Sequence, residues 1–130
     1  MKEVYDFLKK CGVFYLATVD EDKPRVRPFG ALNIFENKLY IQTGKIKNVS
    51  KQIEKNSNVE ICGMYEGKWI RLEGKLVRDD RLDAKVSMLD NNEELKALYK
   101  AEDDNTEVLY FTDAKATIYS FTDEPKIIIL

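Results

Sequence analysis

A lysine-rich turn at the start of a predicted helix is the stretch of this sequence best suited to bind an anion. A strand-like segment ends at Thr43-Gly44, and Lys45, Lys47 and Asn48 follow as the helix begins. Lysines in the first turn of a helix face the positive end of its dipole, which costs about 0.3 to 1 kcal/mol each at exposed positions. A phosphate at the helix start would offset that cost by accepting backbone N–H groups and pairing with the lysines. The alternative is an ordinary solvated helix start.

Two arginines on the preceding strand are the second cationic feature. Alternation along residues 25–29 places Arg25, Arg27 and Phe29 on one face of a strand, and Val26 and Pro28 on the other. Neighbouring arginines repel each other unless they are solvated or paired. The strand is therefore either a solvent-facing edge or one whose arginines face an acidic ligand.

Composition limits the classes of protein that this sequence can form. With 130 residues, 44% hydrophobic and 34% charged, the chain predicts a single globular domain over residues 1–130. A net charge of −2 argues against general binding to nucleic acid or to an anionic membrane. No apolar run approaches the roughly 20 residues of a membrane-spanning helix. The basic character is local, because residues 38–55 hold five lysines against one glutamate.

The histidine and cysteine counts exclude several kinds of site. The chain has no histidine, which excludes a histidine-based catalytic triad, zinc site or haem ligand, and no metal site is expected. Two cysteines are too few for a disulfide framework. The N-terminal segment MKEVYDFLKKC is charged and helical in pattern, unlike a secretory signal. We therefore expect a cytoplasmic protein.

Many short strands with a few helices are predicted along the chain. Two-residue turns at Glu36-Asn37 and Glu66-Gly67 indicate hairpins. The expected strands cover residues 13–19, 25–29, 31–35, 38–43, 59–65, 68–77, 108–112, 116–121 and 126–130. The expected helices cover residues 2–10, the segment after Lys45, 81–90 and 92–99. This pattern favours an antiparallel α+β barrel or sandwich over a parallel doubly wound sheet.

The chemistry of the site is better explained by a cofactor than by a catalytic constellation of the chain itself. Gly44-Lys45 lacks the upstream glycine and the following Ser or Thr of a P-loop, and neither a dinucleotide fingerprint nor a CxxC pair occurs. Arginine and lysine side chains fit a phosphomonoester. Phe29, Tyr65 and Trp69 are candidates for the walls around an attached ring. These features favour a phosphorylated aromatic cofactor.

The ordered segments VFYLATVDEDKPRVRPFG, NKLYIQTGKIKNVSKQIEKNSNVEI and KWIRLEGKLV resemble the pyridoxamine phosphate oxidase-like, FMN-binding split-barrel family. The resemblance covers nearly the whole chain and is closest to the short bacterial members grouped with nitroimidazole-reductase-like proteins. It implies an antiparallel six-stranded split β-barrel with flanking helices. It also implies a homodimer that binds two FMN molecules at the subunit interface.

The resemblance assigns one cofactor site to three parts of the chain, with Trp69 contributed by the second subunit. The cofactor-binding residues that it implies are Arg25, Arg27, Pro28, Phe29, Gln42, Thr43, Lys45, Lys47, Asn48 and Trp69. The chain departs from the true oxidases at Asn48-Val49, where they have an Arg-Lys pair, so Lys45 and Lys47 would substitute. It also lacks their C-terminal substrate motif, which argues against vitamin B6 oxidation. The histidine that the nitroimidazole-reductase branch often has near the flavin is absent, which leaves that substrate open.

Three functions follow from these features. The first is a flavin-dependent oxidoreductase that transfers electrons from a reduced nicotinamide or another donor to a small acceptor. The second is a non-catalytic FMN-binding protein for storage or sensing. The third, a barrel that binds single-stranded nucleic acid through Lys45, Lys47, Lys51 and aromatic side chains, is disfavoured by the acidic pI near 5.3. The donor, the acceptor and the choice between FMN and a deazaflavin stay open.

Overall fold

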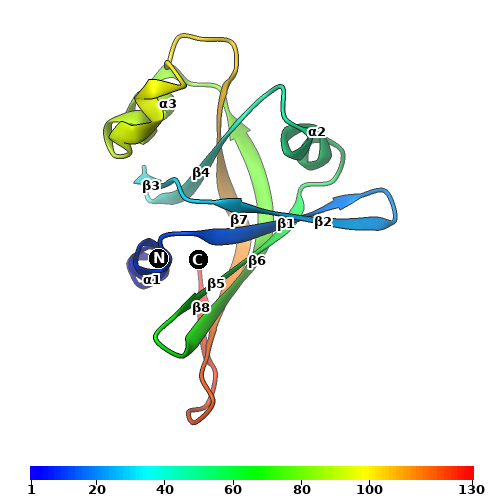
Figure 1. The fold of residues 1–130 in the computed structure, drawn as a ribbon, viewed down its shortest axis with the longest axis vertical. Coiled ribbons are helices and arrows are strands. Elements are labelled where there is room, and N and C mark those ends of the chain that lie inside the picture. The colour runs from blue at the N-terminus through cyan, green and yellow to red at the C-terminus, as the bar shows by residue number, and fades with distance from the viewer.

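One antiparallel sheet forms the framework of the computed structural model, which describes residues 1–130 (Figure 1). The strands are β1 (Phe14–Asp20), β2 (Lys23–Phe29), β3 (Leu32–Phe35), β4 (Lys38–Gly44), β5 (Asn58–Tyr65), β6 (Lys68–Asp79), β7 (Thr106–Tyr119) and β8 (Lys126–Ile129). Their order is β2-β1-β5-β6-β7-β4-β3, and β8 pairs with β7. The predicted α+β class is confirmed. The predicted number of six strands is wrong, because the sheet has eight, of which β3 and β8 have only four residues each.

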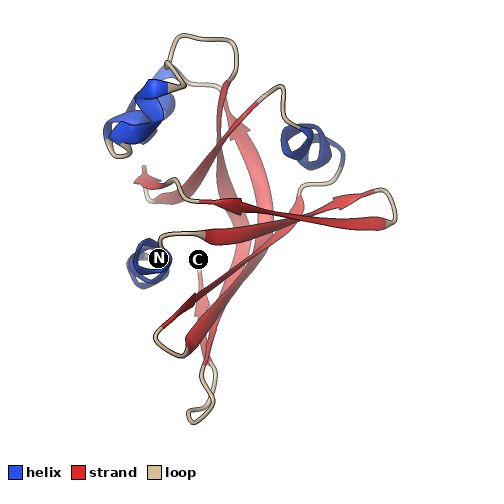
Figure 2. Ribbon diagram, viewed as in Figure 1, coloured by secondary structure: helices blue, strands red, loops and turns tan.

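Two helices bridge the open side of this sheet. β2 and β3 end the strand order and do not pair, so the barrel is split. Helix α1 (Lys2–Cys11) contacts β5 and β3, and α2 (Asn48–Lys55) contacts β1 and β4. Helix α3 (Leu82–Asp90) contacts β3 and β7 and leads into a 3₁₀ turn (Glu93–Ala97). Figure 2 shows the helices at the margins of the sheet.

The core fixes the position of α2 against the strands. Val49 and Ile53 of α2 are buried together with Leu16 of β1, Ile61 of β5 and Leu72 of β6. Burying a side chain of this size contributes about 1.5 to 3 kcal/mol. Because the apolar side of α2 is held in the core, its polar side is left facing β2.

Both predicted hairpin turns are confirmed. Glu36 and Asn37 have φ values of 50° and 60°, and Glu66 and Gly67 have φ values of 48° and 76°. Two successive positive φ angles are what a type I′ hairpin turn requires, because its twist matches that of the flanking strands.

The C-terminal half corrects two predictions. The strands predicted over residues 108–112 and 116–121 form the single strand β7. Asp113 has a φ of 49°, and the register of β6 against β7 shifts near Gly74, so the chain bends without leaving the sheet. Gly74 permits this bend because a Cβ there would lie 2.9 Å from the Cβ of Ala114. The helix predicted over residues 92–99 is only the short 3₁₀ turn.

One face of the sheet is not covered by a helix, and we call it the outer face. It includes side chains of β1, β2 and β5 that point away from the core, since opposed residues of paired strands share a face. Tyr15, Val26 and Met64 on this face are 50%, 68% and 60% exposed. None of the helices is long and apolar enough to cross a lipid bilayer.

Candidate anion-binding site

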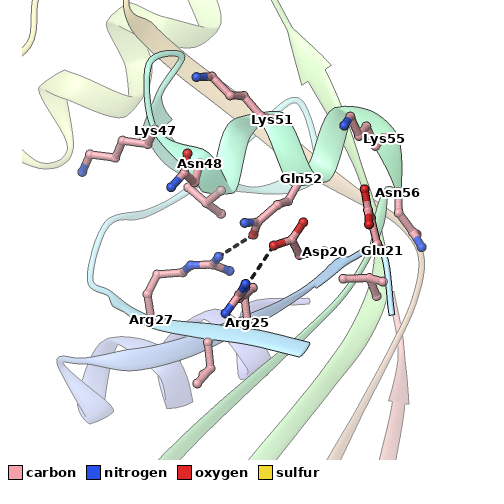
Figure 3. Close-up of a pocket in the computed structure, with 13 residues that line it drawn as sticks. Asp20, Glu21, Arg25, Arg27, Lys47, Asn48, Lys51, Gln52, Lys55 and Asn56 are labelled. Carbon is pink, nitrogen blue, oxygen red and sulfur yellow. Dashed lines mark hydrogen bonds and ion pairs between the residues drawn. The ribbon is translucent and has the colours of Figure 1, made fainter. Parts of the chain in front are cut away.

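A cavity of about 830 Å³ lies between β2 and the polar side of α2 (Figure 3). Its walls come from the β1–β2 hairpin on one side and from the start and length of α2 on the other. The lining residues are Val19, Asp20, Glu21, Arg25, Val26, Arg27, Lys47, Asn48, Val49, Lys51, Gln52, Lys55 and Asn56. Most ligand pockets are mainly apolar. This one is mainly polar, so it suits the charged end of a ligand.

Positive charge dominates the cavity. Five lysine and arginine side chains line it against two acidic ones. Arg25 donates from Nε to the carboxylate of Asp20 at 3.0 Å. The other four cations of the cavity, Arg27, Lys47, Lys51 and Lys55, form no ion pair within the chain, so their charge is available to an anion.

Arg27 is held by three oxygen acceptors. It donates from Nη1 to Thr18 Oγ1 at 2.7 Å and to the backbone oxygen of Leu16 at 3.3 Å. Its Nη2 donates to Gln52 Oε1 at 2.6 Å, which ties β2 to α2. Burial and the nearby Arg25 lower the pKa of Arg27, but an arginine in a protein stays protonated.

The start of α2 is open to a ligand. Lys47 occupies the N-cap position without a side-chain capping bond, and the first turn of the helix contains no acidic residue. The first N–H groups of such a helix lack partners within the helix, and together with the helix dipole they favour an anion. Neither a carboxylate nor a capping hydroxyl competes for these donors.

Asn105, in the loop before β7, fixes the turn that precedes α2. Its backbone oxygen accepts from the N–H of Lys45 at 2.8 Å, and its Oδ1 accepts from the N–H of Ile46 at 3.1 Å. Its side chain also lies directly against Gly44, where a Cβ would be 2.9 Å from Nδ2. Gly44 is therefore needed for this close approach.

We expect Gly44→Ala to destabilise the fold by about 1 to 3 kcal/mol, because the added methyl group displaces Asn105. It should also weaken binding of inorganic phosphate, since the turn that aims Lys47 is disturbed. Denaturant unfolding and a phosphate titration measure the two effects. Gly30→Ala is the control, because a Cβ there meets only the oxygen of Gly12 at 3.6 Å. Equal effects of the two variants would contradict the role of Gly44.

The structure brings four of the ten sequence-predicted site residues together at the cavity, namely Arg25, Arg27, Lys47 and Asn48. Two others lie elsewhere. Lys45 faces Asp80 at 3.8 Å and does not line the cavity. Trp69 stacks on Tyr119 with ring centroids 5.5 Å apart, near Phe121 and away from α2.

The remaining four predicted residues do not line the cavity. Phe29 packs on Phe14, and Pro28 is exposed on the outer face. Gln42 and Thr43 are buried on β4, and neither side chain finds a hydrogen-bond partner for its polar atoms. A buried polar group without a partner is costly, so these side chains hold donor and acceptor capacity that the chain itself does not use.

Sequence reasoning did not assign Lys51, Lys55, Gln52 or Asn105 to the site. Lys47, Lys51 and Lys55 are spaced by four residues, so their places on one side of the helix were detectable from the sequence. The contacts of Gln52 and Asn105 join segments 25 and 59 residues apart, and no local pattern predicts them.

The open antiparallel barrel and its cationic cavity at a helix start define a small ligand-binding split-barrel protein. A sequence model of pyridoxamine 5'-phosphate oxidase matches residues 1–119. The chain therefore belongs to the pyridoxamine 5'-phosphate oxidase family, and the family predicted from its sequence is confirmed. No curated protein matches the chain.

Solved structures extend this relationship. A NimC/NimA family protein from Clostridium acetobutylicum is 46% identical, with a TM-score of 0.98 over 100% of this chain and 92% of that one. General Stress Protein 26 from Bacillus anthracis is 23% identical, with a TM-score of 0.77 over 99% and 97% of the two chains. A pyridoxamine 5'-phosphate oxidase-related, FMN-binding protein from Nostoc punctiforme is 16% identical, with a TM-score of 0.66 over 99% and 95%. The last two share the fold.

Proposed function

We propose that this protein is an FMN-binding flavoprotein that acts as a flavin-dependent oxidoreductase on a small acceptor in the cytoplasm. The observation that carries the proposal is the cavity that Arg25, Arg27 and Lys47 line together, with Lys47 at the open start of α2. A phosphomonoester has about two negative charges and three acceptor oxygens, which match this set of donors. Family membership supports FMN as the phosphorylated ligand.

The residues of the chain fit both ends of FMN. Arg27 and Lys47, which form no ion pair within the chain, would hold the phosphate, with the Asp20-paired Arg25 beside them. Gln42 and Thr43 are successive residues of β4 and point to opposite faces, so Thr43, on the side of β4 that faces α2, would be the one to contribute a polar contact toward the ring. Bound FMN would supply the redox chemistry, passing electrons from a reduced nicotinamide or another donor to the acceptor. The role of the chain itself would be to bind FMN and to orient it.

The outer face supports the proposal that two copies form a dimer and complete the site. Only three of the thirteen residues that line the cavity are hydrophobic, and none of them is aromatic. The apolar wall would come from the outer face of a partner copy, where Tyr15, Met64 and Trp69 lie on neighbouring strands. The same face carries the ion pairs Arg71–Glu60 and Lys115–Glu73, so its charges are balanced and a second copy would not be repelled.

Trp69→Ala should shift the protein from dimer toward monomer and weaken flavin retention. The indole stacks on Tyr119 and lies at a tilt against Phe121, and removing it uncovers both rings. Gel filtration across a range of concentrations and the flavin content of the purified variant measure the outcome. Leu98→Ala is the control, because Leu98 is exposed but lies in the 3₁₀ region. A Trp69 variant unchanged in both properties contradicts this arrangement.

The visible absorption spectrum of the purified protein tests the proposed function. A flavin spectrum, with FMN identified by mass spectrometry after release, is the expected result, and a released deazaflavin would correct the cofactor. Protein that stays colourless after incubation with FMN overturns the proposal. A yellow protein that neither NADH nor NADPH reduces, and that reduces no nitroaromatic or quinone, would instead be a storage or sensing protein.

A further inference from the structure

Arg27 differs from every other arginine of the chain. Arg25, Arg71, Arg78 and Arg81 each form an ion pair with a carboxylate. Arg27 is half-buried, whereas the other four arginines are exposed. Its contacts are nevertheless only a backbone carbonyl, a hydroxyl and a side-chain amide. A partly desolvated charge without a counter-charge is unfavourable, so the arrangement is suited to an anion from outside the chain.

The hydrogen bonds around Arg27 form a closed network whose directions are fixed by chemistry. Thr18 Oγ1 accepts from Arg27 and has one proton, which it donates to Gln52 Oε1 at 2.6 Å. Gln52 Oε1 also accepts from Arg27 Nη2 at 2.6 Å. Turning the amide of Gln52 around would set an NH₂ group against these two donors, so only the observed orientation satisfies all three side chains.

We propose that Gln52 and Thr18 are positioning residues that aim the Arg27 guanidinium at the ligand phosphate while leaving its positive charge uncancelled. The neutrality of Gln52 is the essential property. A glutamate would reach the same two donors and would form an ion pair with Arg27, which would neutralise the charge that the phosphate needs. This inference rests on the proposed function, because it assigns a role within the same site.

Gln52→Glu is the sharpest test, because it keeps the shape of the side chain. The affinity for FMN should fall at least about tenfold, since a charge-assisted contact is lost. Binding of riboflavin, which lacks the phosphate, should change little. The thermal midpoint should be kept or rise, because a new ion pair links β2 to α2. A purely structural role predicts the opposite, with a lower thermal midpoint and both ligands weakened equally.

Two further comparisons distinguish the positioning of Arg27 from a general effect of added negative charge on FMN affinity. Asn37→Asp makes the same amide-to-carboxylate change in the exposed β3–β4 turn, outside the cavity, and should leave FMN affinity unchanged. Thr18→Val removes the hydroxyl that holds Arg27 and should lower the ratio of FMN to riboflavin affinity, whereas Thr18→Ser should preserve it. An equal loss in Asn37→Asp and Gln52→Glu overturns the inference.

Inorganic phosphate, titrated in parallel, distinguishes failure of the inference from failure of the proposed function. If the wild-type protein binds FMN and Gln52→Glu binds it equally well, the positioning role is wrong and the flavoprotein proposal stands. If the wild-type protein binds phosphate but no FMN, and Gln52→Glu loses phosphate, the positioning role stands and the FMN assignment is wrong. If the wild-type protein binds neither, both are wrong.

Discussion

Replacing Lys47 with glutamate is expected to abolish FMN retention and to leave the fold intact. Lys47 caps α2 and lines the cavity without an acidic partner, and its side chain is exposed, so neither packing nor an ion pair is lost. The variant removes a charge-assisted contact of about 1.5 to 3 kcal/mol and adds repulsion against the phosphate. We therefore expect at least about a hundredfold loss of affinity, measured by titrating the apoprotein with FMN, with an unchanged circular dichroism spectrum.

Lys45→Glu is the matched control for this prediction. The two lysines are two residues apart in the same turn, but Lys45 is directed toward Asp80 and does not line the cavity. The control variant makes the same charge change and should retain most FMN affinity. Equal losses in the two variants would mean that Lys45 also binds the phosphate, as the family resemblance implies.

The second large effect is expected at Asp79, a buried carboxylate at the end of β6. It accepts from the hydroxyl of Tyr40 at 2.7 Å and from Arg81 Nη2 and Nε at 2.9 and 3.0 Å. Arg81 also reaches Glu36 at 2.7 Å, so the network ties β6 to the β3–β4 hairpin. Asp79→Asn should destabilise the protein by about 2 to 4 kcal/mol, because the Tyr40 hydroxyl is left buried beside a mismatched amide.

The stability contributed by Asp79 is expected to decrease at acidic pH. Arg81 and Tyr40 lower the pKa of Asp79 from 3.8 to about 2. The folded state thus favours the carboxylate, which contributes about 2 kcal/mol above the unfolded pKa and loses this contribution as pH falls from about 4 to 2. Urea unfolding between pH 7 and 2 should show this loss in the wild-type protein and a smaller one in Asp79→Asn.

Asp80→Asn is the control for the acid-dependent loss. Asp80 is the next residue along the chain, but it is exposed. The variant loses only its ion pair with Lys45, whose Nζ lies 3.8 Å from Asp80 Oδ1. An exposed pair of this kind contributes about 0 to 1 kcal/mol. If Asp79→Asn follows the same pH curve as the wild-type protein, another carboxylate governs acid unfolding.

Local patterns predicted most of the fold because the elements involved are governed by nearby residues. The Glu36-Asn37 and Glu66-Gly67 turns follow from the chemistry of two-residue hairpins, and α2 follows from its spaced apolar residues. The prediction failed at Asp113, where a turn-like residue sits inside a continuous strand. The continuous strand depends on glycine at position 74 of the neighbouring strand, because any side chain there would collide with Ala114, 40 residues further along the chain.

By itself, the sequence determined the class of fold, the family, and the two cationic segments of the site. Arg25 and Arg27 alternate on a strand and Lys47 begins a helix, and both facts depend only on the period of the backbone. Only the tertiary structure decided which cations share a cavity. The split of the sheet sets α2 over β2, which turns Lys47 toward the arginines and Lys45 toward Asp80. The tertiary structure also places Gln52 against Arg27. This contact joins two elements that are distant in the sequence, and the packing of α2 in the core brings them together.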